Sequence, residues 1–234
     1  MEKALQKVVQ LLGPDAAQLI WRARFERVQH MPGANQKFRR IADTSDKEQL
    51  GDYLAEVLFA LIFAGLGFRV EIEPLGEKGP DLRILRDDHS AIVETMRFRK
   101  IYPGPPMLSL DETSILPVYG NLPRDIRKAF EKILAKFPQL SDEESIIAIW
   151  NDDEDLEEIE VEQAVLDLRN DATRQILSLP RGLSFVFYGS KWIGAQQLYC
   201  FPLRFLIEPH QAIWSKELEN SRVGELVQRA LDHL

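Results

Sequence analysis

The sequence contains a single cysteine, Cys200, among 234 residues. One cysteine allows no disulfide within the chain and no cysteine-rich zinc site, and this favours a reducing compartment such as the cytoplasm. The four histidines show no spacing typical of metal ligands or of a nucleophile and its base. A glycine-rich phosphate loop is also lacking, because YPGPPM at 102–107 has too many prolines to offer consecutive backbone N–H groups.

Long apolar runs and a net positive charge are lacking as well. The longest apolar run, from Val57 to Phe68, has about twelve residues, too few to cross a bilayer core of ~30 Å. The N-terminal segment MEKALQKVVQLLG is amphipathic and charged, unlike a signal peptide. The formal net charge of -8 gives no overall attraction to nucleic acid or to an anionic membrane, although a local basic face is compatible with it. We therefore expect a cytoplasmic protein with no membrane contact.

What is present is the composition of a folded protein, with 45% hydrophobic and 28% charged residues. Periodicity and turn residues predict one α/β domain with a mixed sheet flanked by helices. The polar connection at 86–90 predicts that two of its strands form an antiparallel hairpin. We expect helices over 2–30 (two, broken at GPD), 46–66, 121–137, the second half of 152–178 and 215–233, a loop over 31–36, and strands over 68–73, 81–86, 91–98, 145–150, 183–189 and 197–206.

Three acidic residues lie in segments whose other residues indicate buried core. Glu94 follows an apolar run in AIVETMRF, Asp81 opens the apolar run DLRIL after Gly-Pro, and Glu56 interrupts LAEVLFALIFA. An isolated buried carboxylate is costly unless it is paired, protonated or bound to a cation. We expect the three acids to converge in one cleft, where a hard divalent cation would relieve their repulsion. For Glu56 the alternative is a position near the helix N-terminus, with its carboxylate reaching water past Asp52.

The order of these acids and elements resembles the PD-(D/E)XK nuclease-like superfamily, whose members have restriction-endonuclease-like folds. The resemblance covers roughly residues 46–150 and rests on Glu56 in the buried helix, on GPDLRIL with Asp81, and on IVETM with Glu94. It implies an α-β-β-β-α-β core over 46–150, extended by N-terminal helices over 1–45 and by strands and a helix over 151–234. It further implies metal-dependent hydrolysis of a phosphodiester in DNA or RNA. Asp81, Glu94 and the backbone carbonyl of Thr95 would hold Mg²⁺ or Mn²⁺, with Glu56 contributing directly or through water.

The sequence departs from the family motif at Met96, where the motif has a lysine. A thioether can neither orient water nor stabilise negative charge, and losing one such group typically costs a factor of about 10² to 10³ in rate. Arg83 lies on the same strand face as Asp81, about 6.6 Å further along. Lys128 and Lys132 flank the buried stripe of the helix over 121–137, where they either lean over the acids or lie on a solvated face. The predicted catalytic residues are therefore Glu56, Asp81, Glu94, Arg83 and Lys128.

Two interpretations of function remain open. The first is a metal-dependent nuclease with a displaced lysine. The second is an inactive protein of the same fold that binds nucleic acid, a protein partner or a second copy of itself. A third possibility is that the match to the motif arises by chance in an unrelated α/β protein. The basic stretch over 21–40 either grips phosphates through its arginines and aromatics or forms an amphipathic helix whose aromatics face the core. The acidic tract over 142–162 is interpreted as a solvated face.

Overall fold

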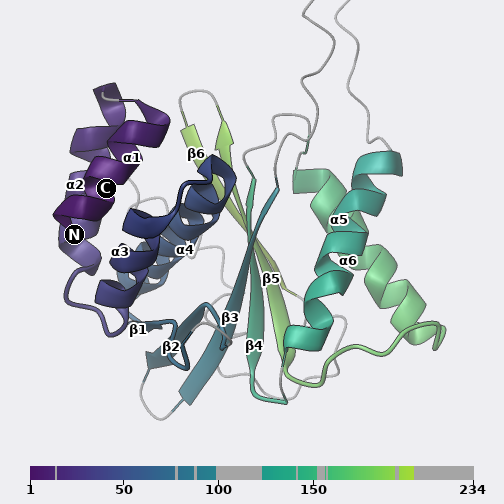
Figure 1. The fold of residues 1–234 in the computed structure, drawn as a ribbon. Helices are drawn as coiled ribbons and strands as arrows, with labels where there is room; N and C mark the ends of the chain where they lie inside the picture. Colours follow the sequence, from purple (N-terminus) through teal and green to yellow (C-terminus); the bar gives the residue numbers. More distant parts are fainter. Residues whose placement is uncertain are drawn as a thin grey trace, which may run out of the picture.

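The computed structural model describes residues 1–13, 15–76, 79–86, 89–98, 123–140, 142–151, 156, 158–192 and 195–202. Within them, helices and strands follow one another in the order that Figure 1 shows. The elements are α1 (Glu2–Leu12), α2 (Asp15–Val28), α3 (Ala34–Asp43), α4 (Lys47–Gly65), β1 (Arg69–Ile72), β2 (Leu82–Arg86), β3 (His89–Phe98), α5 (Pro123–Lys136), the 3-10 helix η1 (Phe137–Gln139), β4 (Ser145–Asn151), α6 (Glu158–Thr173), β5 (Leu183–Trp192) and β6 (Ala195–Pro202).

The six strands form one mixed sheet in the order β1-β2-β3-β4-β5-β6. Strand β2 is antiparallel to both of its neighbours, β1 and β3, whereas β3, β4 and β5 are parallel and β6 is antiparallel to β5. Parallel neighbours need a crossover connection, and α6 provides it between β4 and β5. The expected mixed α/β sheet and its hairpin of β2 and β3 are confirmed.

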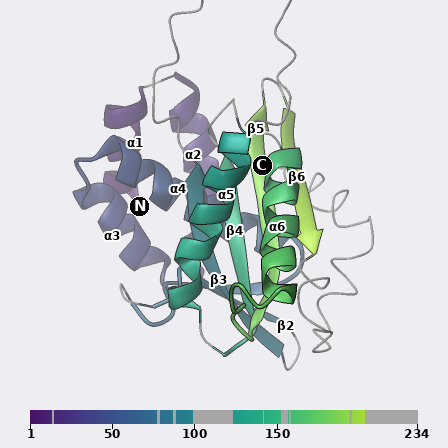
Figure 2. The same ribbon diagram turned by 90° about the vertical axis from the view of Figure 1, so that its right-hand side faces the viewer.

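Helices cover both faces of the sheet. Figures 1 and 2 show α1 to α4 on one face and α5 and α6 on the other. The first core joins α1 to α4 with residues such as Val93 and Ala148, and the second joins α5 and α6 with residues such as Phe98 and Ile147. Because side chains alternate along a strand, Glu94 shares the face of Phe98 and lies under α5.

Helix α4 is the central element of the larger core. Asp46 caps its N-terminus by accepting a hydrogen bond from the backbone N–H of Glu48 (2.8 Å), and the helix ends at Gly65. Every residue from Leu54 to Phe63 is buried, including Glu56. The prediction of a long helix with a buried acid is confirmed, and burial on all sides holds for Leu54 to Phe63 but not for the first turns of α4, which are mostly exposed or partly buried.

Helix α3 corrects the predicted loop over 31–36 and the absence of any predicted element up to residue 45. Gly33 begins it in the left-handed region (φ 84°), where a Cβ atom would overlap the carbonyl oxygen of Ile72. The backbone N–H of Ile72 donates to the carbonyl of Pro32 (2.8 Å), so the turn before α3 is held against the edge strand β1. Phe38 and Ile41 then bury the apolar face of a short, basic helix.

Three further outcomes concern the rest of the chain. Trp21 and Phe25 are buried, so the aromatics of the basic stretch face the core, as its amphipathic-helix alternative states. The predicted helix over 215–233 and the proline-rich segment YPGPPM at 102–107 lie outside the described residues. Among the described helices, none is both long enough and apolar enough to span a membrane.

Candidate functional site

Asp81 and Glu94 lie opposite each other where strands β2 and β3 begin to separate. Leu82 pairs with Val93, which places Asp81 at the next position, opposite Glu94. The preceding residue, Pro80, has no N–H, so the ladder cannot continue with a donor from that residue. The side chain of Asp81 links the two strands at this point. Its Oδ2 accepts hydrogen bonds from the backbone N–H (2.7 Å) and the hydroxyl (2.8 Å) of Thr95.

Glu94 is 5% exposed and lies beneath the C-terminal end of α5. Lys136 Nζ lies 3.2 Å from Glu94 Oε2 and also donates to the side-chain oxygen of Gln139 (2.9 Å). Burial, together with the negative charge of Asp81, raises the pKa of Glu94 to about 7, although Lys136 opposes the shift.

Glu56 belongs to a second cluster of charged residues. Its other members lie on α3 and directly after β1. The ammonium of Lys37, whose side chain is 1% exposed, forms ion pairs with Glu56 and with Glu73. Arg40 adds a further ion pair to Glu73 (3.1 Å). Burial lowers the pKa of Lys37, but the two carboxylates outweigh that effect and raise it overall. Burial and the charge of Asp81 raise the pKa of Glu56 to about 8 against the opposing effect of Lys37.

Glu73 connects the two clusters. It follows β1 with a left-handed backbone (φ 47°), an uncommon conformation for a residue other than glycine. Its side chain binds Lys37, while its backbone N–H donates to the carbonyl of Asp81 (2.8 Å). The backbone position of Asp81 therefore depends in part on the buried ion pairs of Glu73.

The oxygen atoms at Asp81 and Glu94 suit a hard divalent cation. Two carboxylates and the backbone carbonyl of Thr95 are the donor types that Mg²⁺ prefers, and Mg²⁺ commonly uses one or two protein carboxylates with water completing its shell. Within the described residues, no three His, Cys, Asp or Glu side chains are close enough to share a metal ion. The trio with Glu56 is thus not a ready-made site, and a ligand role for each acid stays a prediction.

The other predicted site residues contact groups other than Asp81 and Glu94. Lys128 Nζ is 5.9 Å from the ring centre of Phe98, and Arg83 forms a long ion pair with Glu143 (3.8 Å), with its Nε buried. Met96 is partly buried and packs against the core beneath α5 and α6.

The alternative explanation of Glu56 also differs from the structure. Asp52 was expected to lead the carboxylate of Glu56 toward water. Instead, Asp52 accepts a hydrogen bond from Arg97 (3.1 Å), and Glu56 is held by Lys37. Glu56 is therefore a buried, paired acid in this structure.

Sequence reasoning missed three residues of the site, Lys37, Glu73 and Lys136. Lys136 had a detectable signal, because it continues the four-residue spacing of Lys128 and Lys132 on the same helix. Lys37 and Glu73 had none, since their pairing with Glu56 depends on how α3 packs against α4 and β1.

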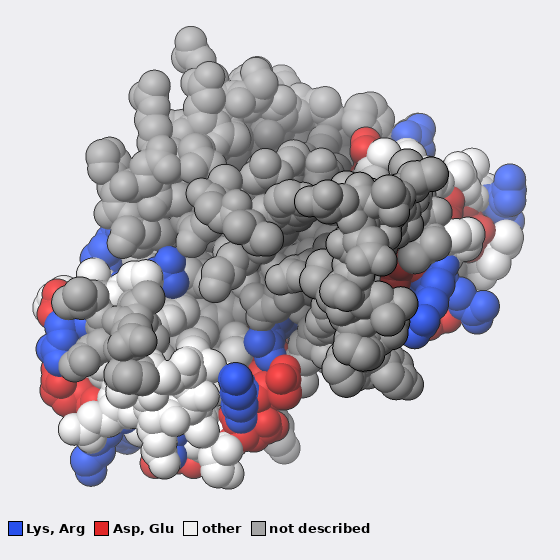
Figure 3. Space-filling view, turned by 90° about the horizontal axis from the view of Figure 1, so that it is seen from above, with Lys and Arg blue, Asp and Glu red and all other residues white. Residues whose placement is uncertain are grey.

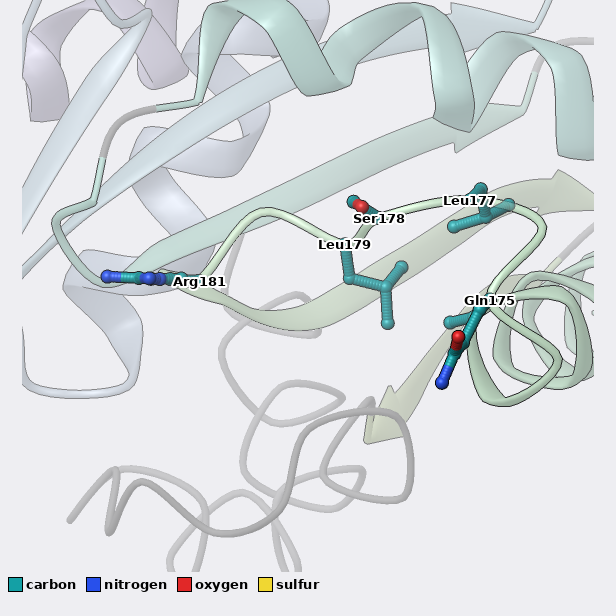
Figure 4. A pocket seen from close by; sticks show the side chains of 6 residues that line it. Gln175, Leu177, Ser178, Leu179 and Arg181 are labelled. Atoms are coloured by element: carbon teal, nitrogen blue, oxygen red, sulfur yellow. The ribbon is translucent and has the colours of Figure 1, made fainter.

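A separate hollow lies between the end of α6 and the start of β5 (Figure 4). It has a volume of about 430 Å³ and contains none of the acids discussed above. Its lining residues are Ala172, Gln175, Leu177, Ser178, Leu179 and Arg181. We assign it no role in the candidate site.

Comparisons with protein-family models, with curated proteins and with solved structures gave no match to this chain. The functional argument therefore rests on the site itself.

Proposed function

We propose that this chain is a divergent protein of the restriction-endonuclease-like fold that hydrolyses phosphodiester bonds in nucleic acid with Mg²⁺ or Mn²⁺. The element order α4-β1-β2-β3-α5-β4 supports this proposal, because it follows the α-β-β-β-α-β order that the resemblance implies. The acids also lie at the expected places in that order, within α4, before β2 and in β3.

One observation carries the proposal: Asp81 lies near two other acids and has no ion pair among the described residues. Its negative charge raises the pKa of both Glu56 and Glu94, so it lies close enough to each to repel it. Each of those two acids has a lysine partner, but no ion pair of Asp81 is found among the described residues. A divalent cation between Asp81 and Glu94 would supply the missing positive charge.

The residues around Asp81 and Glu94 would have different roles in hydrolysis. Asp81, Glu94 and the carbonyl of Thr95 would hold the metal ion, and Glu56, bound by Lys37, would contribute through water. When bound, the metal ion polarises the scissile phosphate and lowers the pKa of the attacking water. Lys136 stands beside Glu94 and supplies the positive charge that Met96 cannot, from a helix rather than from the strand.

The test is thermal melting of the wild type and of Asp81→Asn, each in EDTA and in millimolar Mn²⁺. We expect Mn²⁺ to stabilise the wild type, by about 2.7 kcal/mol at a hundredfold excess over the dissociation constant. Asparagine can still accept both hydrogen bonds from Thr95 while it removes the repulsion with Glu56 and Glu94. Asp81→Asn should therefore be at least as stable as the wild type in EDTA, with no response to Mn²⁺.

Asp52→Asn is the matched control, because Asp52 is bonded to Arg97. This variant should lose stability and keep the full response to Mn²⁺. An unresponsive wild type together with a lower melting temperature for Asp81→Asn would refute the metal site. The better description would then be the inactive binding protein of the same fold.

A further inference from the structure

Basic residues recur at every fourth position of α5, at Arg124, Lys128, Lys132 and Lys136. Four residues advance a helix by about 6 Å, which is close to the separation of successive phosphates in an extended nucleic-acid strand. The helix carries five basic and two acidic residues in a chain whose net charge is -8. The row is therefore a local basic feature on an acidic protein.

Contacts with β3 fix where this row lies. Lys132 Nζ donates to the carbonyl of Arg97 (3.3 Å) and sits 4.6 Å from the ring centre of Phe98, near Lys128. One turn further, Lys136 reaches Glu94. The row thus follows β3 from Phe98 back to the acids, and its first member, Arg124, is exposed.

We propose that these four side chains bind the phosphates of a single-stranded nucleic acid and lead that strand to Asp81 and Glu94. The inference rests on the proposed function and names its substrate class. The spacing of the four basic residues matches the phosphates of one nucleic-acid strand, and the neighbouring helix disfavours binding of a second nucleic-acid strand. Helix α6 packs against α5 and carries five acidic residues and one basic residue, so a second strand on that side would meet negative charge. Figure 3 shows acidic side chains beside basic ones in this region, on the right.

The same contacts predict that binding does not depend on base sequence. Phe98 is 0% exposed, so it holds the lysine side chains in place and offers no face on which a base could stack. Recognition by this row therefore relies on phosphates. Binding of that kind weakens steeply as the salt concentration rises, because each contact releases counterions.

The experiment measures fluorescence anisotropy of a labelled oligothymidylate over a series of salt concentrations, in EDTA so that no metal takes part. The slope of log affinity against log salt is negative. Lys128→Gln combined with Lys132→Gln should make it less steep by about 1.4, since each phosphate contact on a single strand contributes about 0.7. Lys3→Gln combined with Lys7→Gln is the matched control, with the same four-residue spacing on α1, and should leave the slope unchanged. Lys128→Arg with Lys132→Arg should retain the wild-type slope and shows that charge is responsible.

Three results would overturn the inference: no binding by the folded wild type, equal slopes for the Lys128/Lys132 and Lys3/Lys7 variants, or tighter binding of a duplex of the same length. The outcome is separable from that of the proposed function. Salt-dependent binding through α5 without any response to Mn²⁺ would support strand binding by the basic residues of α5 and reject the metal site. A response to Mn²⁺ that depends on Asp81, without binding through α5, would support the metal site and reject strand binding by α5.

Discussion

Replacing Lys37 with methionine is expected to lower the free energy of unfolding by about 3 to 5 kcal/mol, because removing one partner of a buried ion pair leaves the other uncompensated. Lys37 is enclosed between Glu56 and Glu73, and all three side chains are at least nine-tenths buried. Methionine fills a similar volume but donates no hydrogen bond. Urea unfolding of the two proteins at about pH 9, where Glu56 is ionised, measures the loss.

The pH dependence of that loss identifies its cause. The pKa of Glu56 in the folded protein, about 8, is above the ordinary value of 4.5, so the folded state holds a proton that the unfolded state releases between these values. The stability contributed by that proton is complete below pH 4.5 and is lost as the pH rises through about 8. Lys37 lowers the pKa of Glu56, so without it the decline continues to higher pH. The difference between the two proteins should therefore grow above pH 8.

A second substitution separates lost charge from lost packing. At a pH above 8, where Glu56 of the wild type is ionised, Lys37→Met should cost clearly less in a Glu56→Gln background than in the wild type, since one buried carboxylate has been replaced by a neutral amide. Lys7→Met, at a partly exposed lysine on α1, should have little effect in either background. A loss for Lys37→Met that is below 1 kcal/mol, or that is the same at every pH, would contradict an ionic role for this cluster.

Replacing Lys136 with methionine is expected to reduce the rate of nucleic-acid cleavage by a factor of about 10² to 10³, the usual cost of removing one group that stabilises developing charge. Its ammonium forms an ion pair with Glu94 (3.2 Å). It also lowers the pKa of Glu94, which burial and Asp81 raise to about 7. Because Glu94 must be ionised to hold a metal ion, the wild-type rate should rise with pH through about 7. In Lys136→Met this rise should move to higher pH.

Lys132→Met provides the comparison for Lys136→Met, since Lys132 lies one turn away on α5 and bonds to the carbonyl of Arg97 rather than to an acid. We expect it to weaken substrate binding and leave the pH profile in place. Lys136→Arg should recover part of the rate. Steady-state kinetics over a range of pH would show all three effects, and identical profiles for the wild type and Lys136→Met would contradict a role for this lysine at Glu94.

Local sequence signals were sufficient for the parts of the site that lie within one element or one hairpin. Helix α4 has an Asp46 cap and a nearly continuous apolar sequence, and the acids of α4 and β3 stand out because their neighbours are apolar. The pairing of β2 with β3 followed from a short polar connection. The expectation that Asp81 and Glu94 lie close together therefore followed from the sequence, whereas their register across the hairpin is given by the structure.

The partners of these acids could not be found in the same way. Lys37 meets Glu56 only because α3 packs over α4, and α3 begins at Gly33 without a side-chain cap to signal it. Lys128 was predicted at the acids, but α5 runs back along β3, so its last lysine, Lys136, reaches Glu94. Such contacts depend on the direction in which elements pack, and the periodicity of one helix does not specify that direction.

The most direct test of the central claim is cleavage of labelled single-stranded DNA and RNA by the purified protein, with Mg²⁺ or Mn²⁺ and with EDTA. If Asp81 and Glu94 hold a catalytic metal ion, the wild type will cleave at least one of these substrates with metal and neither in EDTA. Asp81→Asn, which keeps the hydrogen bonds of Thr95 and hence the fold, will cleave neither under any condition. Equal, metal-independent activity of the wild type and Asp81→Asn, or no cleavage by a wild type that binds the strand, would contradict the claim.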